Sequence, residues 1–495
     1  MKISRSHEDS FLEIRDFLET GNEFLLRYKY GKSFALLASE IEIELTRGRP
    51  LLGFLDDRGF QFWSVRASEV KDKKLFLTLE RNFGRECETA VLTPRVPAAE
   101  LGASVKLARI EKAGRIAAAI KKHDPRAKVR AVRLSGENGR TAQIFLETAA
   151  KKHFAALADL SGTLSPERLV STSILRLAEF SKRKKNRPEK LWLISEEKQA
   201  RRVRNLQALL RESWKSGIEN FEISYRENDE RLKPLAPLAF EHLWRGRAGN
   251  IPPLEDFELS LAARRIIELA PEKIDAVFSR RGETLRFHGL PFARVRRLAG
   301  EEKIWFGIER DKSLLTARSE KRFFDLVEDL ELYRRADSSN KRHVFYRAAP
   351  EAWLESVLRR CIRRLDANLI LSPVFQQFRA GRERVDLLAL RRDGRLVIIE
   401  IKCAPDREMV FQAADYWRKI ELQRRRGIFK KARLFGEREI SDRPAVCYLV
   451  APTLAFHPDF EFLAGALSEK IEMHRFFLAE NWRENLKVLE RREVK

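Results

Sequence analysis

Residues 385–402, VDLLALRRDGRLVIIEIK, carry two apolar runs that flank the tight-turn sequence Arg392-Asp393-Gly394. This pattern predicts a β-hairpin. A two-residue turn would place Asp386 opposite Ile401, whereas a three-residue turn with Gly394 in the left-handed conformation places Asp386 opposite Glu400. We favour the second register.

In this register Asp386, Glu400 and Lys402 share one face, because side chains alternate at period two along a strand. The hairpin is otherwise apolar on both faces, which predicts a central sheet covered on both sides. Burying two carboxylates and an ammonium there costs free energy unless these groups bind a ligand. Neighbouring carboxylates are suitable ligands for Mg²⁺ or Mn²⁺. Such an ion would activate water at a phosphodiester, and Lys402 would orient that water. The alternative is a surface ion pair between Glu400 and Lys402.

The spacing of Asp386, thirteen residues, and then Glu400-Ile401-Lys402 resembles the PD-(D/E)xK nuclease superfamily over residues 351–478. The resemblance implies a restriction-endonuclease-like αβββαβ core and a DNA substrate. It further implies that Asp386 and Glu400 bind metal and that an acidic residue on the preceding helix assists them. Glu355 matches that acid, with Glu351 one helical turn earlier as the alternative. Val385 departs from the superfamily pattern, in which Pro often precedes the Asp.

Gln412-Ala413-Ala414-Asp415-Tyr416 matches the Gln-x-x-x-Tyr motif of the RecB-like branch. The i to i+4 spacing puts Gln412 and Tyr416 on one helix face. The resemblance implies that Gln412 positions the scissile phosphate or its water and that Tyr416 contacts the strand. A simple aromatic core stripe competes for Tyr416. The basic residues expected to contact the nucleic-acid backbone are Arg384, Arg418, Lys419, Arg424, Arg425 and Arg426.

Periodicity and turn signals divide the 495 residues into four regions of a mixed α/β protein. We expect a β-rich module at 1–105, an α/β domain at 106–228, a linker with a second β-rich module at 229–345, and the nuclease-like domain at 346–495. Both α/β regions follow the order αβββαβαβ, and each comes after a β-rich module, which predicts a tandem duplication of a β module followed by an α/β domain. The alternative is a chance match of a common alternation.

In the first copy, Asp159 alone corresponds to the carboxylates of the second, since Ala142 and Ser161 stand where we align Asp386 and Lys402. We therefore expect a degenerate copy that holds DNA or packs on the active one. Its basic run from Lys182 to Arg187 would suit phosphates.

Composition narrows the class of protein. Lys and Arg total 97 against 73 Asp and Glu, a net charge of +24 that favours a polyanionic partner. No apolar run is long enough to span a bilayer, and the acidic N-terminus does not resemble a signal peptide, so we expect a cytoplasmic protein that does not insert into membranes. The four cysteines lack metal-site spacing.

The sequence therefore predicts a divalent-metal-dependent DNA nuclease with one active site. Two alternatives remain open: a non-catalytic nucleic-acid-binding protein built on a decayed nuclease fold, and a scaffold in a DNA repair or defence complex. The oligomeric state is left undetermined by the sequence.

Overall fold

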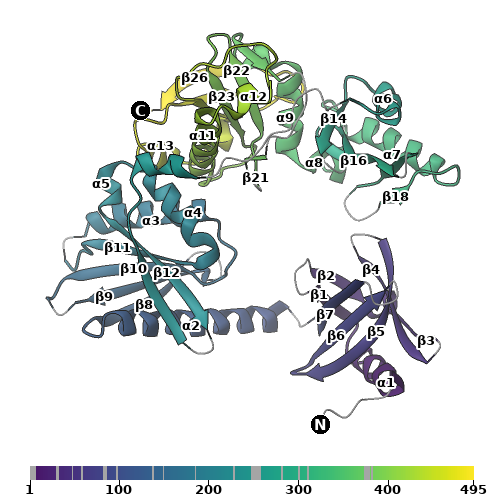
Figure 1. Cartoon of the computed structure of the whole chain (residues 1–495), viewed down its shortest axis with the longest axis horizontal. Helices are drawn as coiled ribbons and strands as arrows, with labels where there is room; N and C mark the ends of the chain where they lie inside the picture. The colour runs from purple at the N-terminus through teal and green to yellow at the C-terminus, as the bar shows by residue number, and fades with distance from the viewer. Residues whose placement is uncertain are drawn as a thin grey trace. The chain divides into compact units, whose positions relative to one another are not determined.

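The computed structural model describes residues 7–28, 33–46, 48–56, 59–81, 86–95, 98–135, 139–148, 150–183, 185–226, 229–246, 258–279, 282–298, 301–308, 312–372, 379–380 and 383–494. The chain divides into two compact units. The first comprises Met1–Val105 with Trp305–Phe323, and the second comprises Lys106–Ile304 with Phe324–Lys495. The fold is mixed α/β, as predicted (Figure 1).

The first unit is built on a seven-stranded sheet with the order β2-β1-β7-β6-β5-β4-β3. Helix α1 packs on it through the buried Ile14 and Phe17, in a core that includes Trp63. The unit also holds Trp305, Phe306 and the two-residue β18 (Ser313–Leu314), which pair with each other. The elements are α1 (His7–Leu18), β1 (Glu23–Tyr28), β2 (Ser33–Leu37), β3 (Glu42–Thr46), β4 (Arg49–Asp56), β5 (Gly59–Lys71), β6 (Lys74–Arg81) and β7 (Glu86–Pro94).

The first α/β domain has a six-stranded sheet with the order β13-β12-β11-β10-β9-β8. Apolar residues of α2 cover one face of the sheet, and those of α3 and α4 cover the other. Helix α3 starts where Ser165 accepts a hydrogen bond from the Arg168 amide, with Pro166 at its first position. The elements are α2 (Ala98–His123), β8 (Lys128–Ser135), β9 (Thr141–Glu147), β10 (His153–Asp159), α3 (Pro166–Ser181), β11 (Lys190–Glu196), α4 (Glu197–Ala208), α5 (Glu212–Lys215), β12 (Ile218–Arg226) and β13 (Asp229–Leu235).

The second β module contributes the antiparallel neighbours β14, β15 and β16. Two buried arginines tie it to the helix that follows. Arg286 pairs with Asp275 at 2.7 Å and with Glu355 of α9 at 3.4 Å, and Arg334 donates to the His288 carbonyl at 2.8 Å while stacking over Trp353. The elements are α6 (Leu261–Glu268), β14 (Ile274–Ser279), β15 (Gly282–Phe287), β16 (Leu290–Leu298), β17 (Glu301–Phe306), α7 (Glu320–Tyr333) and α8 (Val344–Arg347).

The second α/β domain has a six-stranded sheet with the order β19-β22-β23-β24-β25-β26. Residues of α9 pack on one face, and residues of α11 and α13 pack on the other. The elements are α9 (Pro350–Arg360), α10 (Ile362–Leu365), β19 (Leu369–Leu371), β20 (Arg379–Ala380), β21 (Glu383–Arg384), β22 (Leu387–Arg391), β23 (Leu396–Ile401), α11 (Met409–Arg425), α12 (Ile428–Lys431), β24 (Val446–Pro452), α13 (Phe460–Ala464), β25 (Met473–Leu478) and β26 (Val488–Val494).

The two sheets have the same strand order and the same strand directions. In each, the first three strands are antiparallel, the next two joins are parallel, and the last strand is antiparallel. The predicted repetition of strand order is therefore confirmed. Two strands were missed. Residues 229–235, predicted as linker, form β13, and β26 occupies the same place at the end of the second sheet. Within the region predicted to begin with a linker, 229–345, residues 247–257 lie outside the described residues.

The two α/β domains pack through equivalent elements. Helices α3 and α4 share one apolar cluster with α11 and α13. The segments that follow α4 and α13 run antiparallel to each other. Arg211 N donates to Ala466 O at 2.9 Å, and Ser468 N donates to Leu209 O at 2.8 Å. Contacts of this reciprocal kind are the mark of a two-fold interface, here formed within one chain.

Candidate functional site

The hairpin β22–β23 has the register that places the two predicted carboxylates opposite each other. Leu387 lies opposite Ile399 and Leu390 lies opposite Leu396, and the turn contains Gly394 at φ +79°. Continuing this register puts Asp386 opposite Glu400, as predicted. One oxygen of Asp386 accepts a hydrogen bond from the Ile401 amide at 2.9 Å, which fixes its carboxylate at the end of the hairpin.

Glu400 is buried at this place, with 3% of its surface exposed. Its Oε1 lies 3.4 Å from Lys402 Nζ, while its Oε2 is buried and has no hydrogen-bond partner among the described residues. Burial raises the pKa of Glu400 well above its usual value, and the negative charge of Asp386 adds to the increase. Such a group is costly to keep ionised unless a cation approaches it.

Lys402 supplies the positive charge at the site. Its Nζ contacts Glu400 and lies 3.3 Å from Asp406, a partner that the sequence reading did not single out. Burial works to lower the pKa of Lys402, but the carboxylates of Glu400, Glu351 and Asp406 outweigh it and raise this pKa. The ammonium is therefore held protonated. Asp406 could have been found from its position four residues after Lys402 in the loop before α11.

The two candidate acids on α9 lie in different surroundings. Glu355 is buried and pairs with Arg286 at 3.4 Å and with Arg359 at 3.2 Å, so its carboxylate is engaged with the second β module. Glu351, in contrast, acts on the pKa values of both Glu400 and Lys402. The structure thus places the alternative acid, Glu351, rather than Glu355, in electrostatic reach of the hairpin.

Gln412 and Tyr416 lie one turn apart on α11. Gln412 Oε1 is buried without a hydrogen-bond partner among the described residues, as is Glu400 Oε2. Tyr416 is half-buried against the apolar cluster that the two α/β domains share, and Lys419 Nζ lies 5.6 Å from its ring centre. The core-stripe interpretation of Tyr416 is therefore supported by its packing.

Four of the six basic residues predicted to contact a nucleic acid pair with acidic residues of their own helix. Asp415 pairs with Arg418 at 2.6 Å and with Lys419 at 2.7 Å, and Glu421 pairs with Arg424 and Arg425. Arg426 donates weakly to the Trp244 carbonyl. Arg418 is buried, the side chain of Arg424 is only 8% exposed, and both are neutralised by carboxylates of their own helix, so a contact of either with the nucleic-acid backbone is not supported. The Arg384 side chain lies outside the described residues.

The described part of the chain contains no group of three or more His, Cys, Asp or Glu side chains arranged to hold a metal ion. The predicted trio of Asp386, Glu400 and Glu355 is therefore not assembled. What the fold does bring together is the pair of Asp386 and Glu400. Mg²⁺ commonly uses one or two protein carboxylates and takes its other ligands from water and phosphate. The pair fits such an ion, and the unpartnered Oε2 of Glu400 would be available as a ligand.

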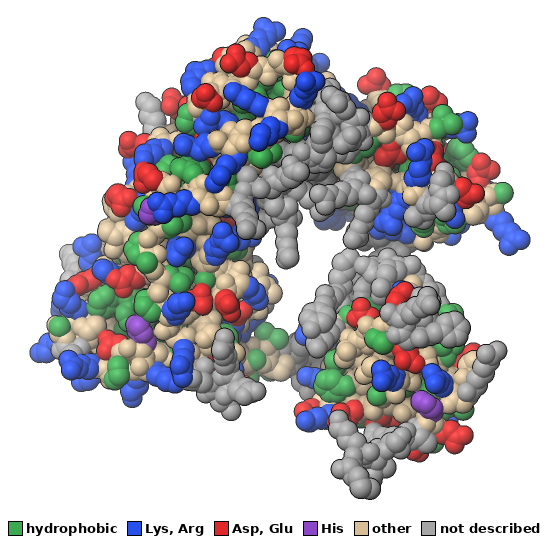
Figure 2. Space-filling view, viewed as in Figure 1, with side chains coloured by type: hydrophobic (Ala, Val, Ile, Leu, Met, Phe, Trp, Pro, Cys, Tyr) green, Lys and Arg blue, Asp and Glu red, His purple; other side chains and the backbone are tan. Residues whose placement is uncertain are grey.

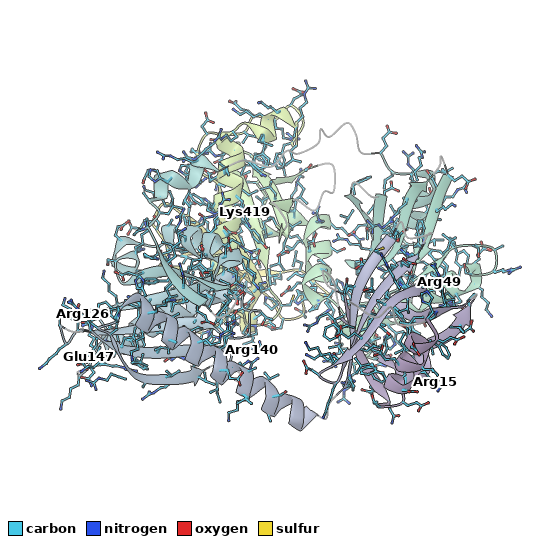
Figure 3. The ribbon with its side chains drawn as sticks, turned by 60° about the horizontal axis from the view of Figure 1, so that its bottom comes forward. Arg15, Arg49, Arg126, Arg140, Glu147 and Lys419 are labelled. Carbon is cyan, nitrogen blue, oxygen red and sulfur yellow. The ribbon has the colours of Figure 1, made fainter. Side chains whose placement is uncertain are left out.

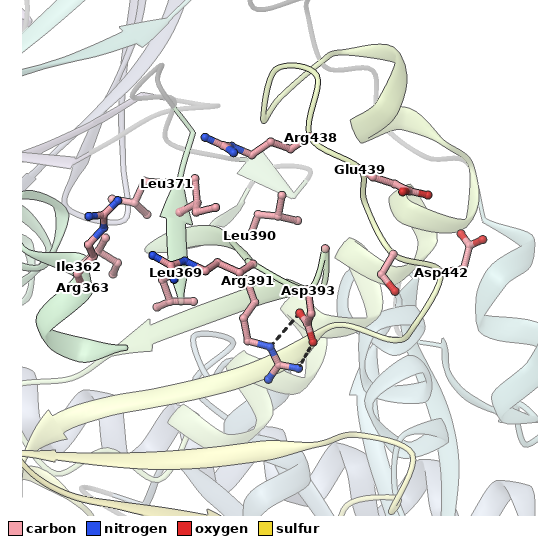
Figure 4. Close-up of a pocket in the computed structure, with 14 residues that line it drawn as sticks. Ile362, Arg363, Leu369, Leu371, Leu390, Arg391, Asp393, Arg438, Glu439 and Asp442 are labelled. Atoms are coloured by element: carbon pink, nitrogen blue, oxygen red, sulfur yellow. Dashed lines mark hydrogen bonds and ion pairs between the residues drawn. The ribbon is translucent and has the colours of Figure 1, made fainter. Parts of the chain in front are cut away.

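A cavity of about 1090 Å³ lies at the opposite end of the hairpin, around the turn. Leu369, Leu371 and Leu390 form apolar parts of its lining. Figure 4 shows Arg363 and Arg438 on one side, Glu439 and Asp442 on the other, and Arg391 bonded to Asp393 between them. None of the predicted catalytic residues lines this cavity, so it does not belong to the carboxylate site.

In the first α/β domain, Asp159 ends β10 as Glu400 lies near the end of β23, and its cross-strand partner is Thr141. This register equates Thr141, rather than Ala142, with Asp386. Asp159 accepts hydrogen bonds from the Ser161 amide, the Ser161 hydroxyl and the Leu164 amide at 2.7–3.1 Å. Its carboxylate is thus satisfied by the loop that leads into α3.

Comparison with known proteins does not assign the chain to a family. No protein-family model and no curated protein matches the chain. Among solved structures the chain is similar to EndoMS in its apo form, at 12% sequence identity and a TM-score of 0.13, over 39% of this chain and 86% of that one. A likeness at this TM-score supports no statement about fold or activity. Within the described residues, no helix combines the length and apolar character needed to cross a bilayer.

Proposed function

We propose that the chain is a divalent-metal-dependent nuclease that hydrolyses phosphodiester bonds of DNA at one site in the C-terminal α/β domain. The observation that carries this proposal is the buried, unpartnered oxygen of Glu400 beside Asp386 and Lys402. Two neighbouring carboxylates at the end of a buried hairpin lower the stability of the fold. Such a destabilising arrangement is typical of sites that bind a ligand.

Asp386 and Glu400 would hold the metal ion, with Glu351 as the nearby acid of α9. When bound, the ion would lower the pKa of a water molecule and offset the charge that develops on the phosphoryl oxygens. The Ile401 amide orients Asp386 toward that role by holding one of its oxygens. Burial of Glu400 excludes bulk water, which strengthens its attraction for a cation.

Lys402 acts as a hydrogen-bond donor and a positive charge, since its raised pKa keeps it protonated at neutral pH. It is therefore suited to orienting an attacking water or stabilising a phosphoryl oxygen, and unsuited to accepting a proton. Gln412 Oε1 offers a buried acceptor that would orient a proton of the same water.

Cleavage assays on linear, circular and single-stranded DNA test the proposal. We expect the wild-type protein to degrade DNA with Mg²⁺ or Mn²⁺ and to stop with chelator. Asp386→Ala and Lys402→Ala should each lower the rate by about 100-fold or more, since each removes a group at the reacting centre. The matched control is Asp393→Asn at the exposed turn of the same hairpin, which should retain activity.

Equal cleavage by the wild type and both site variants would point to contamination and overturn the assignment. The second candidate, a nucleic-acid binder without cleavage, is favoured by two observations. The described residues hold no three-ligand metal group, and Lys402 already neutralises part of the carboxylate charge. Binding of DNA by a well-folded wild-type protein that cuts under none of these conditions would establish that candidate instead.

A further inference from the structure

An aromatic pair in the first α/β domain is covered by guanidinium groups. Phe145 of β9 and Phe180 of α3 meet edge to face with ring centres 5.7 Å apart. The Arg183 guanidinium lies 5.1 Å from the Phe145 ring centre and 4.8 Å from that of Phe180. Arg133 of β8 lies 5.5 Å from the Phe145 ring centre. Stacking of this kind holds a guanidinium in place while leaving the N–H groups at its edge available.

These two arginines carry charge that the described part of the protein does not neutralise. Both are exposed, and no described carboxylate lies within ion-pair distance of either. Arg130, three residues before Arg133 on β8, differs because it pairs with Glu147 at 2.6 Å, and its hydrogen bond lowers the pKa of that carboxyl. In Figure 3, Arg126 and Glu147 mark one end of the β8–β9 pair and Arg140 marks the other. Arg133 and Phe145 lie between these ends.

Further cations extend the cluster along the chain. Lys182, Lys185 and Arg187 are exposed and follow α3 directly. The acidic neighbours in sequence are already engaged, since Glu179 pairs with Arg176 at 2.6 Å and Glu189 pairs with Lys152 at 3.1 Å. A favourable interaction with the α3 dipole explains a cation at the C-cap, Lys182, but it fades beyond the helix end and does not explain Lys185 or Arg187.

Overall charge does not single out this cluster, because Lys and Arg side chains are spread over the visible face of the molecule (Figure 2). What distinguishes it is the combination of stacked arginines, a partly exposed aromatic ring and cations without acidic partners. Arginine forks bind phosphate through two parallel hydrogen bonds, and several separate cations suit a ligand whose phosphates repeat. A membrane surface would supply anionic headgroups but would call for exposed apolar anchors, which this cluster lacks.

We propose that this surface, formed by Arg133, Phe145, Phe180, Lys182, Arg183, Lys185 and Arg187, binds the sugar-phosphate backbone of a nucleic acid. The first α/β domain, which has lost the carboxylate pair, would then hold the strand. Only the further step, that the held strand is the one cut by the C-terminal domain, rests on the proposed nuclease function.

Binding of a fluorescently labelled DNA strand to the full chain tests this inference, measured by anisotropy in chelator and in an Asp386→Ala background. Replacing both stacked arginines, Arg133→Gln with Arg183→Gln, should weaken binding about tenfold near physiological salt. It should also reduce the slope of log affinity against log salt by about 1.5, as expected for two lost phosphate contacts. The matched control Arg130→Gln removes a charge from the same strand, and it should leave both quantities unchanged.

Unfolding temperatures of all variants are measured alongside, so that loss of structure is recognised as such. Arg133→Lys with Arg183→Lys keeps the charge without the planar fork and should bind with intermediate affinity. Equal loss in the Arg130→Gln control, or no loss in the double variant, overturns the inference. So does binding of anionic lipid vesicles in place of DNA. Because the binding assay excludes metal, its result does not depend on cleavage. A wild type that binds DNA in this assay but fails to cut it when Mg²⁺ or Mn²⁺ is supplied refutes the nuclease proposal and leaves this inference standing.

Discussion

Glu400 and Asp159 occupy equivalent places in two sheets of the same topology, but their carboxylates meet different surroundings. Asp159 accepts three hydrogen bonds from Ser161 and Leu164, so its charge is satisfied locally. Glu400 faces Asp386 and retains a buried oxygen without a partner among the described residues. Buried polar atoms are nearly always hydrogen-bonded, so an exception marks a place where a ligand is expected.

The effect of a divalent metal ion on protein stability should distinguish Glu400 from Asp159. Mg²⁺ or Mn²⁺ at about 100 times its dissociation constant should stabilise the wild type by about 2.7 kcal/mol. Glu400→Gln should abolish that gain, because it removes a ligand while preserving the shape of the side chain. Asp159→Asn should cost about 1–2 kcal/mol without metal and keep the metal response. Thermal unfolding with metal or chelator measures both quantities, and a Glu400→Gln protein that still responds would contradict the site.

At the scale of elements, the turn of the β22–β23 hairpin sets the register on which the proposed site depends. Gly394 adopts φ +79°, where residues with a side chain are strained. A Cβ there would also lie 2.9 Å from the Glu439 carbonyl oxygen and 3.1 Å from the Ser441 amide. The glycine therefore serves two purposes, the left-handed turn and the close approach of the loop before β24.

Gly394→Ala and Gly436→Ala form a matched pair for testing this. Gly436 has φ +65°, but nothing lies within 4 Å of the position of its Cβ. We expect Gly436→Ala to lower the free energy of unfolding by about 1 kcal/mol, from backbone strain alone. Gly394→Ala should cost about 2–4 kcal/mol, since the clash with the backbone adds to that strain. Chemical denaturation measures both, and equal costs would show that the close approach is unimportant.

Elements with a strong apolar pattern could be predicted from the sequence, and charged ones could not. The hairpin was predictable because its apolar runs and turn lie within 18 residues, so the register of Asp386 and Glu400 followed from local rules. Strand β26, with the sequence VLERREV, is mostly exposed and lacks an apolar alternation. Edge strands are commonly charged in this way, which hides them from pattern reading.

The choice between Glu351 and Glu355 depended on information outside the helix that carries them. Both positions are compatible with the sequence of α9, and Arg286, which engages Glu355, comes from another module. The basic cluster of α11 could have been judged better. Arg418 and Arg424 each follow an acidic residue by three positions, a spacing that favours an ion pair along a helix.

At the scale of the whole molecule, the second unit contains an internal pseudo-dimer of α/β domains. Equivalent helices meet across one apolar cluster, and Leu210 and Leu467, at equivalent places, form an antiparallel bridge. Ser165, the N-cap of α3, donates to Glu408 next to the start of α11, the helix that bears Gln412. The first α/β domain thus contacts the helix that bears part of the proposed active site, so stability and activity of the two domains should be coupled.

Hydrogen exchange tests this coupling. Leu467→Asp would bury an unpaired charge at the interface, since Leu467 is 3% exposed, and should cost about 3 kcal/mol or more. Because the two domains share one core cluster, amide protection should fall in both β11 and β24, although the substitution lies in the second domain. Leu489→Asp on β26 is the control, because Leu489 is 54% exposed and its replacement should leave protection unchanged. Loss of protection confined to the second domain would show that the two sheets unfold independently and that the first domain does not support α11.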